Sequence, residues 1–330
     1  MQAHRLMQYK KIVILGTGGT IAGRAADPSD NIGYTAAQVS VNQLVRAIPA
    51  LAGVTHLRVE QVAQIDSKDM TFAVWARLAE RVHHFLAHDD VQGVVITHGT
   101  DTLEETAYFL QTVLDPAKPV VLTCAMRPAT ALVPDGPQNV SDALAVAEHP
   151  SARGVVAVCG GVVHSALDVQ KVHTYQLNAF SSGDAGPLAY VEEGALRILR
   201  NWPLSHEKQA LHATDLIANI VKAAASNTWP HVEVLMSYAG ASGAVVDALC
   251  LAGVQGLVVA GTGNGTLHHE LEAALLKAQA RGVLVLRATR CVNGRVLSKP
   301  GELLEDSRGL SPVKARIALM LRLMLTDFQT

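Results

Sequence analysis

Short apolar runs alternate with longer amphipathic stretches along most of the chain. The apolar runs are rich in Val, Ile, Leu and Ala and are bounded by glycine, proline or polar residues, which is typical of buried parallel strands. They predict strands at Lys11–Gly16, Gly93–Thr97, Pro119–Cys124, Gly154–Cys159, Val232–Ser237, Gly256–Ala260 and Gly282–Arg287.

Apolar residues in the intervening stretches recur every three or four positions, which is the period of a helix with one buried face. The clearest example runs from Phe72 through Trp75, Leu78 and Val82 to Phe85. Strands that alternate with such helices indicate an α/β fold with a mostly parallel sheet. The same period predicts helices at Leu103–Leu114, Ser141–Glu148, Ala244–Leu251, Leu267–Ala280 and Val313–Leu325.

The strand–helix alternation is interrupted between about Asp168 and Pro230, where glycine, proline and polar residues prevail. It returns at His231. We therefore predict two α/β domains. The larger, N-terminal domain covers 10–200, with a mostly parallel sheet that carries the site. A linker covers 201–230, and a smaller C-terminal domain covers 231–330.

Composition narrows the class of protein. Hydrophobic residues make up 49% of the 330 residues and charged residues 17%, which excludes a largely disordered chain. The net charge is −2 and no block of Lys or Arg occurs, so we expect no nucleic-acid partner. The longest uncharged stretch, Ala248–His269, contains several glycines, and we expect no membrane span.

The four cysteines lie far apart and form no CxxC pair, which favours reduced thiols and a cytoplasmic protein. The sequence also has no HExxH motif and no His/Cys cluster, so we expect neither a metal nor another cofactor.

Two glycine-rich turns that carry threonine follow predicted strands of the N-terminal domain. The first reads GTGGTIAG over 16–23, and the second reads THGTDTLEE over 97–105. Ligands of open α/β sheets bind beyond the carboxyl ends of the strands, so both turns could face one crevice. The first turn lacks glycine at Ile21, as a dinucleotide fingerprint requires, which disfavours an NAD-dependent dehydrogenase.

A threonine hydroxyl is a weak nucleophile that needs a base or a hydrogen-bonded relay. Lys171 could serve if burial lowered its pKa, and Tyr34 lies in a stretch typical of a mobile loop. From the residues alone, other readings stay open: threonines that only cap turns, a surface lysine and an ordinary half-buried tyrosine.

Taken together, the two turns resemble those of the bacterial-type L-asparaginases, the threonine amidohydrolases of the asparaginase/glutaminase family. Further similar segments follow in order, so the resemblance runs from about Lys10 to Leu325. It implies hydrolysis of L-asparagine to L-aspartate and ammonia without a cofactor, with weaker activity on L-glutamine. These further segments are AMRPAT at 125–130, DGP at 135–137, Asn139, 168–174 and GTGNG at 261–265.

The resemblance also implies a role for each site residue. Thr17 would attack the side-chain amide carbon, giving an acyl-enzyme, and Tyr34 on the lid would help to activate it. Thr100, Lys171 and Asp101 would form a second polar triad, in which Thr100 places or activates the water for deacylation.

Substrate binding and assembly follow from the same resemblance. Ser67 would hold the α-carboxylate of the substrate, and Asp101 its α-ammonium. A neighbouring subunit would complete each site with Asn264 and a glutamate, for which we choose Glu302 with Glu305 as the alternative. The implied assembly is a homotetramer, built as a dimer of intimate dimers.

One position departs from the family pattern. Lys68 stands where the family usually has Gln or Glu facing the substrate ammonium, and a lysine there would repel that charge. We expect Lys68 to turn outward or to pair with Asp66, leaving asparagine as the substrate with modest affinity. The positions of a disulfide found in some secreted relatives, near His88 and Ala117, carry no cysteine.

Two further readings compete with the asparaginase. An amino-acid sensor on the same fold would need no nucleophile, so the presence of Thr17, Thr100, Asp101 and Lys171 argues against it. The amidotransferases that act on charged tRNA share both threonine turns, but the chain shows no basic face and no extra RNA-binding domain.

Overall fold

The computed structural model describes residues 10–51, 54, 56–203 and 207–326. Its contacts divide the chain into two units, Met1–Val221 and Lys222–Thr330. Each unit has its own sheet, so neither depends on the other for its main strand pairing.

The first unit contains an eight-stranded sheet in the order β10-β9-β6-β5-β4-β3-β1-β2. The strands from β5 to β2 in this order run parallel, and the pairs β5–β6, β6–β9 and β9–β10 are antiparallel. The bounds are β1 Lys11–Gly18, β2 Leu57–Ile65, β3 Val91–Thr97, β4 Val120–Thr123, β5 Val155–Cys159, β6 Val162–Ser165, β9 Ala189–Glu192 and β10 Ala195–Ile198.

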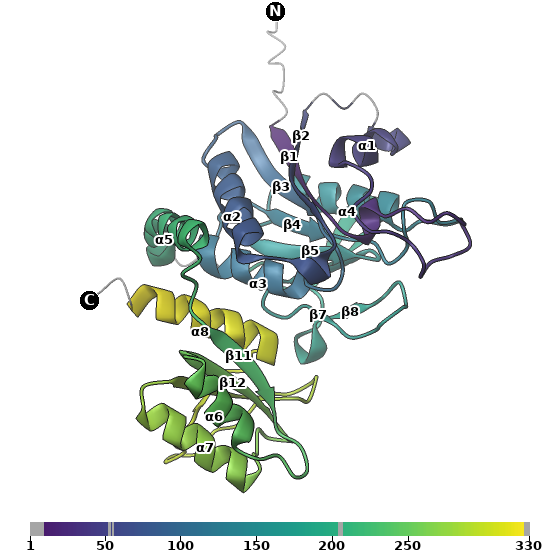
Figure 1. Cartoon of the computed structure of the whole chain (residues 1–330). Helices are drawn as coiled ribbons and strands as arrows, with labels where there is room; N and C mark the ends of the chain where they lie inside the picture. Colours follow the sequence, from purple (N-terminus) through teal and green to yellow (C-terminus); the bar gives the residue numbers. More distant parts are fainter. Residues whose placement is uncertain (1–9, 52–53, 55, 204–206, 327–330) are drawn as a thin grey trace, which may run out of the picture. The chain divides into compact units, whose positions relative to one another are not determined.

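Helices cover both faces of this sheet (Figure 1). Helices α2 (Phe72–Leu86) and α3 (Leu103–Leu114) lie on one face, and α1 (Val41–Arg46) and α4 (Gly136–Glu148) lie on the other. Successive side chains of a strand point to opposite faces, so a strand covered on both sides is apolar throughout. The stretch 12–15 of β1 is accordingly fully buried.

The strand order reverses at one point of the sheet. Strand β1 lies between β2 and β3, and β4 and β5 continue beyond β3. The chain therefore goes from β1 to β2 on one side and then returns to β3 on the other side of β1. Open α/β sheets bind their ligands where the strand order reverses in this way.

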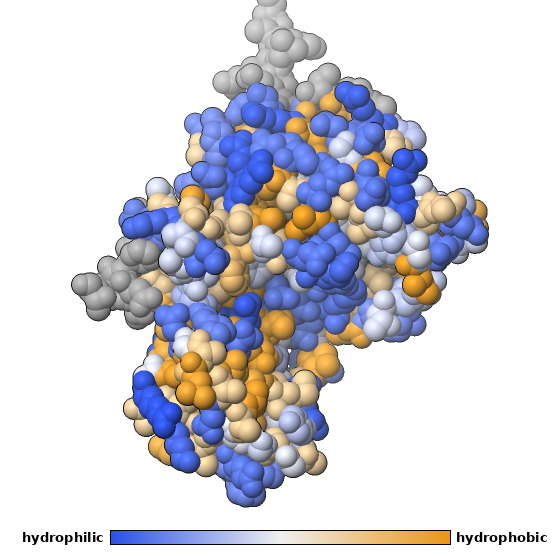
Figure 2. Space-filling view, viewed as in Figure 1, coloured by the Kyte–Doolittle hydropathy of each residue, from blue (hydrophilic) through white to orange (hydrophobic). Residues whose placement is uncertain are grey.

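The second unit is a parallel sheet in the order β11-β12-β13-β14. Helix α8 packs on β11, β12 and β13, and α6 and α7 pack together. In Figure 2 apolar residues gather on the surface of this unit around α6, where the Leu251 side chain is 91% exposed. The bounds are β11 Val232–Met236, β12 Gly256–Gly261, β13 Leu284–Thr289, β14 Glu305–Asp306, α6 Ala244–Leu251, α7 His269–Ala280 and α8 Pro312–Thr326.

The fold class predicted from the sequence is confirmed, and every predicted strand is present with ends within two residues. The sequence pattern missed β2, whose side chains are mostly half-buried and include Glu60 and Gln61, and it missed the antiparallel strands. It also missed α1, β14 and a short hairpin made of β7 (Gln170–Lys171) and β8 (Phe180–Ser181).

The segment 201–230, which we expected to be a linker, contains a long helix. Helix α5 spans Glu207–Ser226, and the boundary between the two units falls inside it. Prolines and polar residues on either side of this helix explain why the interval gives no clear strand–helix rhythm in the sequence.

Candidate active site

The loops that follow three adjacent strands meet at the reversal point of the first sheet. Thr17 lies near the end of β1, Ser67 lies in a short 3-10 turn after β2, and Thr100 follows β3. The parallel pairing sets Gly16 opposite Thr97 and Gly18 opposite Ile65, so the ends of the three strands are level. Side chains from 17–20, 66–69 and 97–102 therefore converge at one edge.

Glycines allow these loops to touch through their backbones. Gly19 has φ 81°, and a Cβ atom there would lie 2.3 Å from the Cα atom of Gly99. A Cβ atom on Gly99 would in turn lie 2.4 Å from the hydroxyl of Ser67. Any larger residue at either position would separate the three loops.

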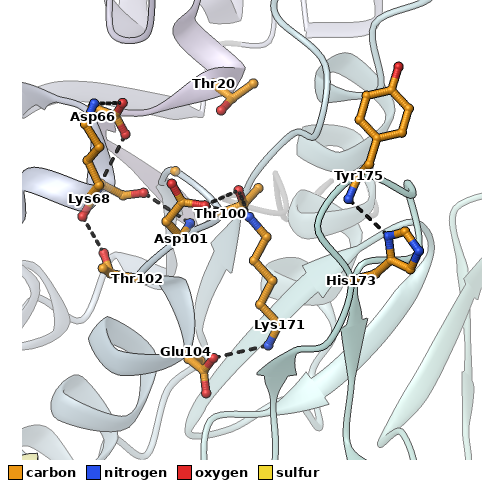
Figure 3. A network of polar contacts seen from close by, with 12 residues as sticks. Thr20, Asp66, Lys68, Thr100, Asp101, Thr102, Glu104, Lys171, His173 and Tyr175 are labelled. Atoms are coloured by element: carbon orange, nitrogen blue, oxygen red, sulfur yellow. Dashed lines mark hydrogen bonds and ion pairs between the residues drawn. The ribbon is translucent and has the colours of Figure 1, made fainter. Parts of the chain in front are cut away.

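Thr100, Asp101 and Lys171 form one hydrogen-bonded cluster (Figure 3). The Lys171 ammonium donates to the Thr100 hydroxyl at 2.8 Å and to the Asp101 carboxylate at 2.6 Å. The Thr100 hydroxyl donates to the same carboxylate oxygen at 3.4 Å. Lys171 comes from β7, and its backbone N–H donates to the Glu104 carboxylate at 3.2 Å. The Thr100 hydroxyl is therefore hydrogen-bonded to both members of the Lys171–Asp101 ion pair.

Ser67 is fixed against the same loop. Its hydroxyl accepts a hydrogen bond from the backbone N–H of Asp101 at 3.2 Å. Its carbonyl accepts one from the Thr102 hydroxyl at 2.8 Å. A hydroxyl that accepts in this way keeps its own proton to donate, so Ser67 offers a donor beside the backbone of Asp101.

Lys68 pairs with Asp66 at the rim of this site (Figure 3). The two charged groups are 2.6 Å apart, and the Asp69 carboxylate lies 3.8 Å from the same ammonium. The hydrogen bond to Asp66 raises the pKa of Lys68, and the negative charges of Asp66, Asp69 and Asp101 add to this. Lys68 is therefore a fixed cation whose charge is balanced by its own neighbours.

The two threonines of the first turn have different partners. The Thr17 hydroxyl, which is buried, donates to the Thr97 carbonyl at 3.0 Å. The Tyr34 hydroxyl bonds instead to the Thr20 hydroxyl at 2.7 Å. The sequence led us to expect Tyr34 to act on Thr17 and gave Thr20 no role. The sequence does indicate Thr20, because it is the second threonine of the glycine-rich turn at 16–23.

The loop that carries Tyr34 is closed at its base. Arg24 and Thr35 exchange two backbone hydrogen bonds of 2.9 Å each. Farther out, the backbone N–H of Ala25 donates to the Thr130 hydroxyl at 2.8 Å. The loop is thus held against the segment that follows β4, and Tyr34 is half-buried beside the first turn.

A buried histidine supports the second turn from beneath. The indole N–H of Trp75 donates to the Thr106 hydroxyl at 2.9 Å, so that hydroxyl donates in turn to Nε2 of His98 at 3.0 Å. The Nδ1–H of His98 then donates to the Gly99 carbonyl at 2.7 Å. Burial lowers the pKa of His98 to about 4, so the ring is neutral at pH 7. Sequence reasoning gave His98 no role.

Asn264 and Glu302 lie in the second unit and are engaged within it. The Asn264 amide donates to the Leu297 carbonyl at 3.0 Å and accepts from the Leu297 N–H at 2.7 Å. Glu302 pairs with Arg287, which lowers the pKa of the Glu302 carboxyl. Glu305, our alternative to Glu302, pairs with an arginine of α8.

Two properties of the described residues bear on cofactors and membranes. Among those residues, no three side chains of His, Cys, Asp or Glu gather to form a group that could hold a metal ion. Within the same part of the chain, every helix is too short or too polar to cross a bilayer.

Comparison with known proteins gives matches along nearly the whole chain. Residues 11–204 match the family described as "Asparaginase, N-terminal", and residues 231–329 match the "Glutaminase/Asparaginase C-terminal domain". L-asparaginase 2 of Escherichia coli is 37% identical over 323 residues, which cover 96% of this chain and 89% of that protein. The glutaminase-asparaginase of Pseudomonas fluorescens is 36% identical, covering 96% and 87%.

A solved structure is similar to this protein in fold as well as in sequence. It is described as a probable cytoplasmic L-asparaginase from Campylobacter jejuni and matches with a TM-score of 0.86 at 37% identity, covering 95% of both chains. The α/β fold, the site at the strand ends and these matches together define a hydrolase of the amidohydrolase class. The chain belongs to the asparaginase family, which confirms the resemblance inferred from its two threonine turns.

Proposed function

We propose that this enzyme hydrolyses L-asparagine to L-aspartate and ammonia, with weaker activity on L-glutamine. The observation that carries the proposal is the cluster of Thr100, Lys171 and Asp101 beside Ser67, next to the end of the strand that contains Thr17. The relatives described as L-asparaginase or glutaminase-asparaginase support the choice of substrate.

An amino-acid zwitterion needs a donor for its carboxylate and an acceptor for its ammonium. In the proposal, Ser67 donates its hydroxyl proton to the α-carboxylate of the substrate, and Asp101 receives the α-ammonium. Asp101 sits between the Lys171 ammonium, 2.6 Å away, and the more distant Lys68, whose charge Asp66 balances. A second, unbalanced cation at this place would weaken binding of the ammonium.

Acylation would begin at Thr17. Its hydroxyl attacks the side-chain amide carbon and forms a tetrahedral intermediate. The C–N bond of this intermediate then breaks, ammonia departs, and the acyl group of the substrate remains bound to Thr17 as an ester. In the present structure the Thr17 hydroxyl donates to Thr97, so it has to rotate toward the substrate. Tyr34 would leave Thr20 and relay the Thr17 proton to the departing nitrogen as its loop settles over the substrate.

Deacylation would use the second triad. Thr100 orients a water molecule toward the ester, and Asp101 and Lys171 hold the Thr100 hydroxyl in place. One proton of the water passes through this hydrogen-bonded cluster to the Thr17 oxygen as the ester C–O bond breaks, so the Thr17 hydroxyl is restored and L-aspartate is released.

The enzyme's assembly and location are part of the same proposal. We infer domains over 10–200 and 231–330 in a homotetramer in which a neighbouring subunit contributes Asn264 and Glu302 to each site. The exposed apolar side chains around α6 support an interface between subunits (Figure 2). A cytoplasmic location is supported by the structural relative described as cytoplasmic, although a relative from Haemophilus influenzae is described as periplasmic.

The first experiment measures ammonia release from L-asparagine and L-glutamine side by side. Thr17→Ala should abolish release and Thr17→Ser should restore part of it, because serine keeps a hydroxyl at that position. Thr228→Ala, at an exposed position outside the site, is the matched control and should keep the activity. Unchanged release by Thr17→Ala would refute the assignment of the nucleophile, and binding without any release would favour the amino-acid sensor.

A further inference from the structure

Two buried thiols face each other at the ends of neighbouring strands. Cys159 ends β5, and Cys124 directly follows β4. Thr123 is the register partner of Val158, so the two cysteines form the next pair along these parallel strands. Their sulfur atoms lie 2.8 Å apart, and the residues are 1% and 5% exposed. Neighbouring strands lie roughly 4.8 Å apart, which is within the range of Cα separations that a disulfide spans.

Polar side chains hold both strand ends in this register. On one side of the thiols, the Thr123 hydroxyl donates to the Val158 carbonyl at 2.9 Å. On the other side, the Asn139 amide donates to the Cys124 carbonyl at 2.9 Å and accepts from the Gly160 N–H at 2.9 Å. The two sulfurs are therefore kept together by contacts that do not depend on the thiols themselves.

We infer that Cys124 and Cys159 are a modification site, at which a peroxide converts the two thiols into a reversible intrachain disulfide. Hydrogen peroxide first oxidises one thiol to a sulfenic acid and releases water. The second thiol then attacks that sulfur, so an S–S bond forms and a second water leaves. Two thiols are oxidised and one peroxide is reduced, and a dithiol reductant reverses the change.

The order of the two steps follows from the surroundings of the thiols. Burial raises the pKa of the Cys124 thiol well above its ordinary value, and the nearby Cys159 adds to this. Cys159 is the more exposed of the two. Because oxidation needs access, Cys159 is the thiol that meets the peroxide, and Cys124 resolves the sulfenic acid.

The bond would also act on the active site, and this part of the inference rests on the proposed function. The backbone N–H of His98 donates to the Thr123 carbonyl at 2.8 Å, so the end of β4 supports the turn that carries Thr100. Shortening the sulfur separation from 2.8 Å to about 2.05 Å draws Cys124 toward β5 and away from that turn. We expect the oxidised enzyme to hydrolyse asparagine at least about twofold more slowly.

The test uses the full chain with Cys250→Ser and Cys291→Ser, which leaves only the paired thiols. The folded protein is treated with hydrogen peroxide, quenched with catalase, denatured, and examined by thiol titration, intact mass and peptide mapping. We expect both thiols to disappear, the mass to fall by two hydrogens, and one linked peptide to appear within a single chain. Dithiothreitol should restore both thiols. Adding Cys124→Ser is the control, in which no intrachain bond can form.

Three outcomes would overturn the inference: both thiols persist after treatment, the cysteines themselves carry added oxygen, or the disulfide links two chains. If the background substitutions disturb folding, peptide mapping of the unsubstituted enzyme answers the same question. The rate of ammonia release is a separate readout. An unchanged rate in enzyme whose mass proves the disulfide would refute the coupling to the site, whereas absence of activity before oxidation would refute only the proposed function.

Discussion

Lys68 is a cation at the rim of the proposed substrate site, and its charge is balanced by Asp66. Its ammonium is 2.6 Å from the Asp66 carboxylate and largely exposed, so it is already neutralised in the empty site. We predict that Lys68→Gln changes the KM for L-asparagine by less than about threefold and leaves kcat unaltered, because exposed ion pairs contribute little. Steady-state ammonia release over a range of asparagine concentrations measures both constants.

The matched variant for this prediction is Asp66→Asn, which removes the partner and keeps the lysine. It should raise KM more than Lys68→Gln alters it, since the released cation then acts on the substrate ammonium. A large fall in KM for Lys68→Gln would instead mean that the lysine reaches into the pocket during binding.

His98 makes stability depend on pH in a defined direction. Its pKa is about 4 in the folded protein, against an ordinary value of 6.5, so the unfolded chain binds the extra proton between these values. Stability therefore rises with pH across this window and is complete above pH 6.5. At pH 5 the free energy of unfolding should be lower than at pH 7.5 by about 2 kcal/mol from this residue.

Urea unfolding at the two pH values tests this prediction. His98→Gln should reduce the difference between them, even if it lowers stability at both, because glutamine does not titrate. His84→Gln, at an exposed position on α2, should leave the difference as it is in the parent protein. Equal pH dependence in His98→Gln and the parent would show that another group is responsible.

At the scale of elements, the contact between the first and second turns is the one most sensitive to added volume. Gly19→Ala would place a methyl group 2.3 Å from Gly99 at a φ of 81°. We predict a loss of more than about 3 kcal/mol in the free energy of unfolding and at least a tenfold loss of activity, because backbone cannot move aside cheaply. Denaturant unfolding and ammonia release measure the two effects.

Gly253→Ala is the control that separates backbone strain at positive φ from steric overlap with a neighbouring loop. Gly253 has a φ of 79°, and no atom lies within 4 Å of the place that an added methyl group would take, so alanine there incurs only the backbone strain of about 1 kcal/mol. Similar losses for the two variants would contradict the close contact between Gly19 and Gly99.

The strands that could be predicted from the sequence are those buried on both sides. Strands such as β3 and β5 are continuous apolar runs, and their ends follow from the glycine and polar residues beside them. Strand β2 could not be found in this way, because it lies at the sheet edge with half-buried polar residues. The two threonine turns were predictable because each directly follows a buried strand.

The rest of the site depends on contacts between residues far apart in the chain. Lys171 reaches Thr100 across 71 positions, from a two-residue strand that no local pattern marks. The packing of the Tyr34 loop on the segment near Thr130 decides which threonine Tyr34 bonds. This packing cannot be predicted from composition. Cys124 and Cys159 likewise read as isolated cysteines until β4 and β5 are paired.

For the whole molecule, the proposed sharing of sites between subunits predicts complementation. Thr17→Ala and Asn264→Ala should each be nearly inactive as pure proteins. Unfolded together and refolded, they should recover about a quarter of the parent activity, because half of the chains keep Thr17 and half of their neighbours keep Asn264. The measurement is ammonia release from the mixture, with the same mixture combined without unfolding as the control.

Failure of the mixture to exceed the two pure variants would argue that each site is complete within one chain. Size measurement of the refolded mixture shows whether oligomers formed, so a lack of assembly is told apart from a lack of sharing. Asn264 would also lose its two bonds to Leu297, and unfolding of the pure variant measures that separate effect.

The meeting of Gly19 with Gly99 has a consequence for how this enzyme can vary. When a large side chain is introduced into a packed core, a neighbour can often shrink and restore the fit. At Gly19 the atoms in the way belong to the backbone of Gly99, and no residue is smaller than glycine. A substitution at Gly19 therefore has no suppressor at Gly99, and the sequences of the two turns can vary only where they leave this contact unchanged.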